Sequence, residues 1–494
     1  MNADVERDYY AILGIAPSAT SKEIQRAYHR LARRYHPDSR EVHTPTTLFH
    51  QVQEAYSVLS DPSSRETYDR RRGELGDDEP SALVWNILLS RDLLYAGHEE
   101  QVLYVLSEIE PAQTWQGELL PLDLSIVIDR STSMEGARLE STKEAASQVV
   151  DELQEDDTLA IVSFSDRAEV ALSGRVGSQR RQFKAAISAL RAGGGTELLQ
   201  GLRVGLHELA AHQREHAVSH LILLTDGRTY GDERPCLAAA DAAGKKGIAI
   251  TALGIGEDWN DDLLDELAAR SGGTSAYIGS PRQVQGLLRD KVRHLGSVHA
   301  TALELTVRAA NGVRVENAFL ISPSLGRLDL SRGVIPLGSL ASDRPLRVLL
   351  EAAVRGQGAG EHRLLQLELN GEVSSPDDGR ETLRKDVRCA FAEETPDRWY
   401  ETTPPAVLSA LRRATLYRMQ EQAWYALEDG DVQAATQRLQ AVATQLLDLG
   451  EERLGRAALL EAERVAKTRR ASQRGRLEIK YGTRSLKLGG DAYD

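Results

Sequence analysis

Several oxygen-bearing side chains follow short apolar runs in the middle of the sequence. The pentapeptide DRSTS places Asp129, Ser131 and Ser133 at alternate positions directly after the run LDLSIVI. Thr196 follows a glycine run, and Asp226 follows the run HLILLT. Carboxylate and hydroxyl oxygens suit hard cations, so the set predicts a Mg²⁺ or Mn²⁺ site. The alternative is that the aspartates cap loops and the hydroxyls satisfy backbone groups.

A repeating pattern of strand and helix has to bring these oxygens together. Between residues 122 and 278, continuous apolar runs alternate with amphipathic stripes such as Thr142 to Leu153 and Glu197 to Ala211. This alternation indicates a doubly wound, mostly parallel α/β sheet, in which ligands bind at the carboxyl ends of the strands. We expect all three oxygen-bearing loops to fall at the carboxyl ends of strands. The predicted strands are Leu122 to Ile128, Thr158 to Phe164, His220 to Thr225, Ile248 to Ile255 and Thr274 to Ile278.

The combination of DxSxS, a later Thr and a later TDG resembles the metal-ion-dependent adhesion site of the von Willebrand factor A (VWA) family. The resemblance implies that serine and threonine ligate the metal directly and that the aspartates act largely through water. It also implies that an acidic side chain of a protein partner fills an open coordination position. Thr132 stands where that family usually has glycine. The residues that correspond to the family's site are Asp129, Ser131, Ser133, Thr196 and Asp226.

A second group of candidate residues lies near the start of the chain. Apolar residues recur with helical spacing from Ile24 to Tyr35, and the opposite face of this helix is basic. Pro37 ends the helix at His36, so His36-Pro37-Asp38 forms a loop before a second amphipathic helix. A basic helical face can also be merely solvated. The basic face consists of Lys22, Arg26, His29, Arg30 and Arg33.

Three blocks of this region occur together in a characteristic order: DYYAILGI, IQRAYHRLARRYHPD and FHQVQEAYSVLSDPSSRETYD. They resemble the all-α J-domain of DnaJ-type co-chaperones. The resemblance implies that the basic helix and the loop of His36, Pro37 and Asp38 dock on a DnaK-type chaperone and stimulate its ATP hydrolysis. An exposed loop with one carboxylate can compete for an arginine that is paired inside the partner.

Length and composition limit the functions that the chain can have. The 494 residues suggest about three domains, and the formal charge of −14 argues against bulk capture of nucleic acid. Cys236 and Cys389 are too few for a disulfide framework or a zinc ribbon. No apolar run has the length of a membrane span, and the first residues do not resemble a signal peptide. We therefore expect a cytoplasmic protein.

The usual enzymatic motifs do not occur in the sequence. There is no GxxxxGK[ST] loop and no GxSxG nucleophile elbow. His207 and His212 are five residues apart, which places them on different sides of a helix and not on one face as in HExxH. A metallohydrolase has little support because no general base or nucleophile stands out near the metal residues. We therefore predict that the chain is not itself an enzyme.

The remaining segments flank the predicted VWA domain. Residues 301–373 alternate apolar and polar positions, with Asn311-Gly312 and Asn370-Gly371 as hairpin turns, which predicts a β-sandwich. After Pro405, helical stripes broken at Gly430 and Gly450 predict a helical hairpin. The predicted domains are a J-domain at 1–72, a linker at 73–82, added strands at 83–120, a VWA domain at 121–295, a β-sandwich at 296–397 and a helical region at 398–494.

These features favour a J-domain co-chaperone whose VWA domain recruits a client or an assembly through Mg²⁺ (or Mn²⁺). The alternative is a metal-dependent scaffold whose J-domain only remodels its own complexes. The expected partners are a DnaK-type chaperone and a protein ligand that offers an acidic residue, with no nucleic acid and no membrane.

Overall fold

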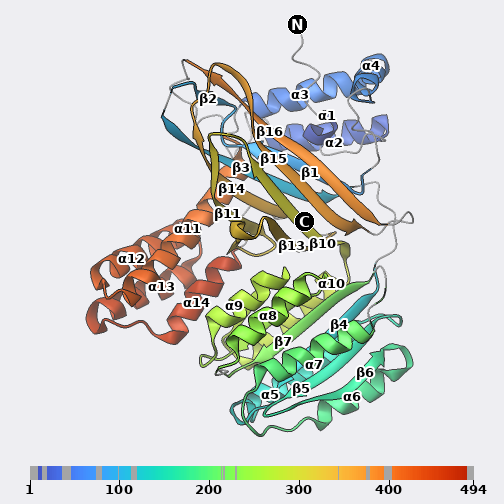
Figure 1. The fold of residues 1–494 in the computed structure, drawn as a ribbon, viewed down its shortest axis with the longest axis vertical. Helices are drawn as coiled ribbons and strands as arrows, with labels where there is room; N and C mark the ends of the chain where they lie inside the picture. Colours follow the sequence, from blue (N-terminus) through green and yellow to red (C-terminus); the bar gives the residue numbers. More distant parts are fainter. Residues whose placement is uncertain are drawn as a thin grey trace.

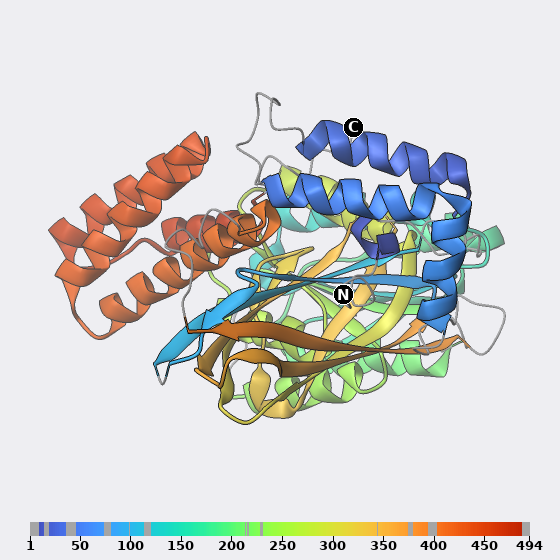
Figure 2. The ribbon, with the colours of Figure 1, turned by 90° about the horizontal axis from the view of Figure 1, so that it is seen from above.

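The computed structural model consists of a small helical domain, a two-layer β region, an α/β domain and a further group of helices (Figure 1). The β region lies between the amino-terminal helices and the α/β domain (Figure 1). Seen from above, the carboxyl-terminal helices project to one side of the molecule (Figure 2). The structure describes residues 9–13, 19–35, 46–73, 81–97, 99–112, 120–212, 214, 217–227, 231–342, 344–373, 379–393 and 403–486.

The amino-terminal domain is a pair of helices with two shorter additions. Its elements are α1 (Tyr9–Leu13), α2 (Ser21–Tyr35), α3 (Thr46–Ser60) and α4 (Pro62–Gly73). The apolar stripes of α2 and α3 face each other, and the rings of Tyr28 and Tyr56 stack with centroids 4.0 Å apart. Asp61 caps α4, because its carboxylate accepts a hydrogen bond of 2.8 Å from the backbone N–H of Ser64. The all-α prediction for this domain is confirmed.

Two antiparallel layers form the β-sandwich. One layer has the strand order β1-β3-β14-β11-β12 and the other has the order β13-β10-β15-β16-β2. Alternating side chains from both layers build one shared apolar core, as the period-two pattern predicts. The strands are β1 (Leu83–Leu89), β2 (Leu93–Tyr95), β3 (Glu100–Pro111), β10 (Val298–Ala309), β11 (Val313–Ser322), β12 (Gly326–Arg327), β13 (Val334–Ala341), β14 (Leu346–Arg355), β15 (Gly360–Val373) and β16 (Arg380–Ala392).

The two Asn-Gly pairs do not form the hairpins that their sequence predicted. Asn311 and Gly312 connect β10 to β11, but these strands belong to different layers, so the turn crosses the sandwich. Asn370 and Gly371 lie inside β15, where both pair with β16. A Cβ atom at Gly371 would lie 2.5 Å from Leu303 Cδ2, so this glycine serves close packing against β10 and not a turn.

The α/β domain has a sheet of strand order β6-β5-β4-β7-β8-β9, parallel except for β6. One apolar cluster covers the face with α5, α6 and α10, and another covers the face with α7, α8 and α9. The doubly wound prediction is therefore confirmed. The elements are β4 (Leu122–Asp129), α5 (Ala137–Glu152), β5 (Thr158–Phe164), β6 (Ala168–Arg175), α6 (Arg180–Ala189), α7 (Leu198–Ala211), β7 (Val218–Thr225), α8 (Glu233–Gly244), β8 (Ala249–Ile255), α9 (Asp261–Ser271), β9 (Ser275–Ile278) and α10 (Pro281–Leu295).

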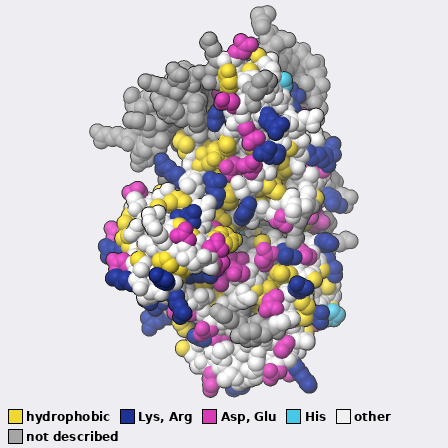
Figure 3. All heavy atoms as spheres, turned by 60° about the vertical axis from the view of Figure 1, so that its left-hand side comes forward, with side chains coloured by type: hydrophobic (Ala, Val, Ile, Leu, Met, Phe, Trp, Pro, Cys, Tyr) yellow, Lys and Arg dark blue, Asp and Glu magenta, His cyan; other side chains and the backbone are white. Residues whose placement is uncertain are grey.

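The carboxyl-terminal region is larger than the predicted hairpin. It consists of α11 (Pro405–Glu428), α12 (Val432–Asp448), α13 (Glu452–Thr468) and α14 (Gln473–Arg484). Gly430 and Gly450 end α11 and α12 with positive φ angles of 82° and 79°, as the breaks in the stripes predict. Side chains of both charge signs are spread over the exposed side of this region (Figure 3). No helix in the described part of the chain is long and apolar enough to cross a membrane.

Candidate metal site and chaperone-binding surface

The two aspartates of the predicted metal site lie at the ends of neighbouring strands. Asp129 is the last residue of β4, and Asp226 directly follows β7. These strands pair in parallel, with Ile128 opposite Leu224, so both carboxylates reach the same edge of the sheet. The two residues are 0% and 1% exposed. The sheet therefore brings two acidic groups together in a buried place at its carboxyl edge.

The loop after β4 connects these two carboxylates through serine hydroxyls. The backbone N–H of Ser131 donates to Asp129 Oδ1 at 2.8 Å. The Oγ atoms of Ser131 and Ser133 are 3.0 Å apart, and Ser133 Oγ donates to Asp226 Oδ1 at 2.7 Å. Four of the five predicted metal residues therefore form one continuous set of hydrogen bonds.

Thr196, the fifth predicted residue, comes from the loop before α7. A Cβ atom built on Gly227 would lie 2.8 Å from Thr196 Oγ1, so this hydroxyl lies beside the backbone that follows Asp226. Thr132 binds the same loop, because its backbone N–H and its hydroxyl both donate to Gly194 O at 3.1 Å. The threonine at the family's usual glycine position thus ties the DRSTS loop to the loop of Thr196.

Thr225 supports the site although the sequence did not single it out. Its hydroxyl donates to Asp129 Oδ2 at 2.6 Å. Burial raises the pKa of Asp129, and the nearby Asp226 carboxylate raises it further, while hydrogen bonds from Thr225 and Ser131 oppose the shift. Keeping these buried carboxylates charged therefore costs free energy, and a bound cation would offset this cost.

The donor set fits a hard divalent cation. Mg²⁺ binds oxygen at about 2.0–2.1 Å, which places adjacent ligands of an octahedron about 3.0 Å apart. The two serine oxygens have this separation of 3.0 Å. Among the described residues, no group of three or more His, Cys, Asp or Glu side chains offers an alternative metal site. Ser131, Ser133 and Thr196 would hold such an ion, with Asp129 and Asp226 supplying the charge.

Arg138 is a site residue that the sequence reasoning missed. Its Nη1 atom lies 2.5 Å from Asp226 Oδ2, and the side chains are 35% and 0% exposed, respectively. Arg138 stands in the first turn of α5, where the positive end of the helix dipole disfavours a cation unless an acid compensates. In the sequence, the available signal for Arg138 was a basic residue near the start of a predicted helix, just after DRSTS.

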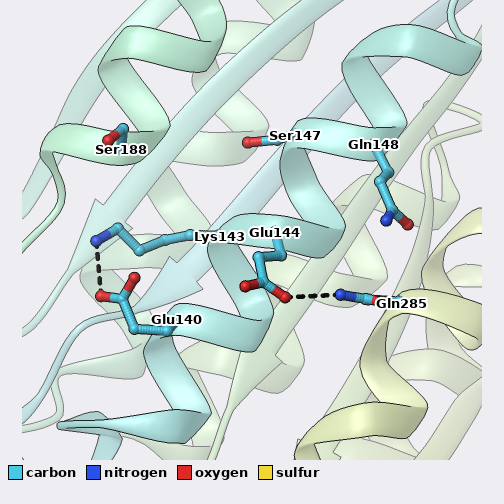
Figure 4. Close-up of a pocket in the computed structure, with 7 residues that line it drawn as sticks. All are labelled: Glu140, Lys143, Glu144, Ser147, Gln148, Ser188 and Gln285. Carbon is cyan, nitrogen blue, oxygen red and sulfur yellow. Dashed lines mark hydrogen bonds and ion pairs between the residues drawn. The ribbon is translucent and has the colours of Figure 1, made fainter.

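A polar groove lies on the outer side of α5 (Figure 4). Its volume is about 360 Å³, and it includes none of the predicted metal residues. The ammonium group of Lys143 pairs with Glu140 at 2.9 Å, and Gln285 donates to Glu144 at 2.8 Å (Figure 4). The charged side chains of the groove are thus each paired with another residue of its lining. The lining residues are Glu140, Lys143, Glu144, Ser147, Gln148, Ser188 and Gln285.

The predicted chaperone-binding residues of α2 are partly described. Lys22, Arg26 and His29 are exposed on α2. Arg30 and Arg33 belong to the same helix, but their side chains lie outside the described part. The loop residues His36, Pro37 and Asp38 also lie outside the described residues.

Comparison with family models defines the class of protein. A DnaJ domain matches residues 8–69, and a von Willebrand factor type A domain matches residues 123–289. The Sll0103-like, C-terminal alpha-helical domain matches residues 405–489. The protein is therefore a J-domain joined to a VWA domain with a carboxyl-terminal helical domain.

Individual relatives place the chain more closely. It is 31% identical over 333 residues to the uncharacterized protein sll0103 of Synechocystis, covering 66% of this chain and 78% of that protein. The chain belongs to the Sll0103-like family. The chaperone protein DnaJ 2 of Thermus thermophilus is 53% identical over 64 residues, which span 13% of this chain and only 23% of that relative.

Solved structures share the fold. A von Willebrand factor type A protein from Catenulispora acidiphila superimposes with a TM-score of 0.66 at 20% identity, covering 82% of this chain and 97% of that chain. The ArnB paralog VWA2 from Sulfolobus acidocaldarius has a TM-score of 0.54 at 15% identity, covering 82% of this chain and 100% of that chain. At these identities the likeness concerns the fold alone.

Proposed function

We propose that this protein is a co-chaperone that stimulates ATP hydrolysis by a DnaK-type chaperone and recruits a client or an assembly through a Mg²⁺-dependent VWA domain. The proposed stimulation of the chaperone is supported by the J-domain match over residues 8–69 together with the exposed basic residues of α2. A basic face steers an acidic partner surface into contact and gives the association a salt dependence.

The loop after α2 is the proposed stimulating element. His36, Pro37 and Asp38 follow the last residue of α2 directly in the sequence, and we infer that they act together with the basic face of that helix. A carboxylate that pairs with a partner's arginine competes with the pairing that this arginine has inside the partner. In this proposal the ATP-hydrolysing site belongs to the partner.

The VWA domain is the proposed client-binding element. Support comes from the serine oxygens 3.0 Å apart and from the two buried carboxylates at the edge of the sheet. A cation ligated directly by neutral hydroxyls, with the aspartates acting largely through water, keeps an open coordination position that a carboxylate of a protein partner can fill. Mg²⁺ or Mn²⁺ would meet these requirements.

The first test measures ATP turnover by a DnaK-type chaperone with and without this protein. We expect His36→Gln and Asp38→Asn to remove the stimulation without changing the circular dichroism of the protein. Arg26→Glu should weaken it in a salt-dependent way, whereas Gln25→Glu, at a neighbouring exposed position, adds charge without removing a basic contact. Full stimulation by both loop variants would refute the co-chaperone role.

A second test separates the co-chaperone from the scaffold that only remodels its own complexes. Proteins captured from host lysate in Mg²⁺ are compared with those captured in chelator. Unfolded or varied clients that are released by the chaperone and ATP support the co-chaperone. A single stable assembly, with stimulation confined to that assembly, favours the scaffold.

A further inference from the structure

The metal site already holds one positive charge that belongs to the protein itself. Asp129 and Asp226 are buried, and the guanidinium of Arg138 pairs with the second of them at 2.5 Å between Nη1 and Oδ2. The same Nη1 atom is 3.4 Å from the carbonyl oxygen of Ser133. Arg138 therefore contacts one carboxylate of the set and the backbone of one proposed hydroxyl ligand.

The chain makes room for this side chain. A Cβ atom on Gly256, in the loop after β8, would lie 3.0 Å from Arg138 Nη2. Gly256 has a φ angle of 77°, which also favours glycine. The guanidinium thus lies between Asp226 and a loop whose backbone comes close enough to contact it.

We propose that Arg138 is a built-in counter-ion that occupies the site in place of the divalent cation and has to release Asp226 when the cation binds. This inference rests on the proposed metal-dependent function and names how that site is regulated. Two carboxylates carry a charge of −2, which one divalent cation neutralises alone. With Arg138 still in place the set would carry +1 in a buried place, which is unfavourable.

Arg138 is placed so that it can leave. Its side chain is 35% exposed, whereas that of Asp226 is fully buried, so the guanidinium can turn into solvent while the carboxylate stays. The side chain is long, and the first turn of α5 repels a cation once its acidic partner is neutralised. The ion pair therefore competes with the metal without blocking it permanently.

The test is calorimetric titration of the full chain with Mg²⁺. Arg138→Gln removes the competing charge, and we expect its dissociation constant to fall about tenfold, the factor that corresponds to about 1.4 kcal/mol. Arg138→Lys keeps the charge and should bind within a few-fold of wild type. Arg130→Gln is the matched control, because Arg130 lies next to Asp129 in sequence but pairs at 3.9 Å with the exposed Glu169.

Melting temperatures give an independent measurement. In chelator, Arg138→Gln should melt lower than wild type because the buried Asp226 carboxylate loses its guanidinium partner. Mg²⁺ should then raise the melting temperature of the variant more than it raises that of wild type. Equal or weaker Mg²⁺ binding by Arg138→Gln, with wild type binding normally, overturns the counter-ion role and leaves the proposed function intact. Absence of binding in both proteins overturns the metal-dependent function and the competition together.

Discussion

At the scale of single residues, the candidate metal site combines two charged groups with neutral oxygens. Asp129 and Asp226 supply the negative charge, while Ser131 and Ser133 present hydroxyl oxygens at the spacing of adjacent ligands. Thr225 holds the orientation of Asp129 from the neighbouring strand. Charge and positioning are thus assigned to different side chains, which predicts different costs for their removal.

We expect Asp129→Ala to abolish Mg²⁺ binding and Ser133→Ala to weaken it less. The first change removes one of two charges that hold the ion, whereas water can replace a neutral hydroxyl. Calorimetric titration measures both, and the isosteric Asp129→Asn controls for the cavity that alanine leaves. Each variant should still stimulate the chaperone ATPase fully, because the J-domain is a separate unit. If Asp129→Ala binds Mg²⁺ as tightly as wild type, the five residues are structural caps.

At the scale of elements, helix α14 connects the carboxyl-terminal helices to helix α9 of the VWA domain through ion pairs. Lys480 Nζ lies 2.6 Å from Asp261 and 2.8 Å from Asp265 of α9, and Arg484 lies 2.8 Å from Asp265. The Tyr481 hydroxyl donates to Asp265 at 2.7 Å. Burial tends to raise the pKa of Asp265, but the charges of Arg484 and Lys480 outweigh it and lower the pKa to about 2.

Two neighbouring acids of α9 allow a matched comparison of this cluster. Asp265→Asn removes a charge that pairs with the buried Lys480 and with Arg484, so we expect it to lower the free energy of unfolding by about 3–5 kcal/mol. Asp262→Asn removes a charge whose side chain is 75% exposed, so its cost should stay below about 1 kcal/mol. Urea unfolding measures both values. Equal losses would show that the buried cluster contributes nothing specific.

At the scale of the whole molecule, α14 contributes to two apolar cores at once. Leu477 and Tyr481 belong to the core of the VWA domain, whereas Ile479 belongs to the core of the carboxyl-terminal helices, as does Leu486 just after the end of α14. The ring of Tyr481 lies 5.6 Å from that of the buried Trp259. The helical region also packs on the sandwich, where Tyr417 meets Phe319 with ring centroids 6.1 Å apart. The helical region therefore joins the VWA domain to the sandwich.

A chain that ends at residue 471 tests this joining role. Loss of α14 exposes the apolar surface under Leu477 and Tyr481, worth about 1.5–3 kcal/mol for each buried side chain. We expect the melting of the VWA domain in calorimetry to move down by about 5 °C or more and to separate from that of the other parts. A chain that ends at residue 486 keeps α14 and should melt as wild type. If both truncated chains melt as wild type, α14 does not join the two cores.

The sequence alone was sufficient where the determining signals are local. Helical and strand periodicity predicted the four structural classes, and the DRSTS loop, Thr196 and Asp226 were predicted to meet because parallel strands end at one edge. Signals of this kind depend on neighbours a few residues apart. They do not depend on how the domains pack together.

The tertiary structure decided the features that depend on residues far apart. Arg138 and Asp226 are 88 positions apart, and Lys480 and Asp261 are 219 apart, so no local pattern could identify the partner in either ion pair. Gly371 resembled a turn residue until the packing of Leu303 explained it. These features depend on the direction of side chains and on which surfaces meet. The physical reason is that a buried charge finds its partner, and a close contact forms, only in the complete fold.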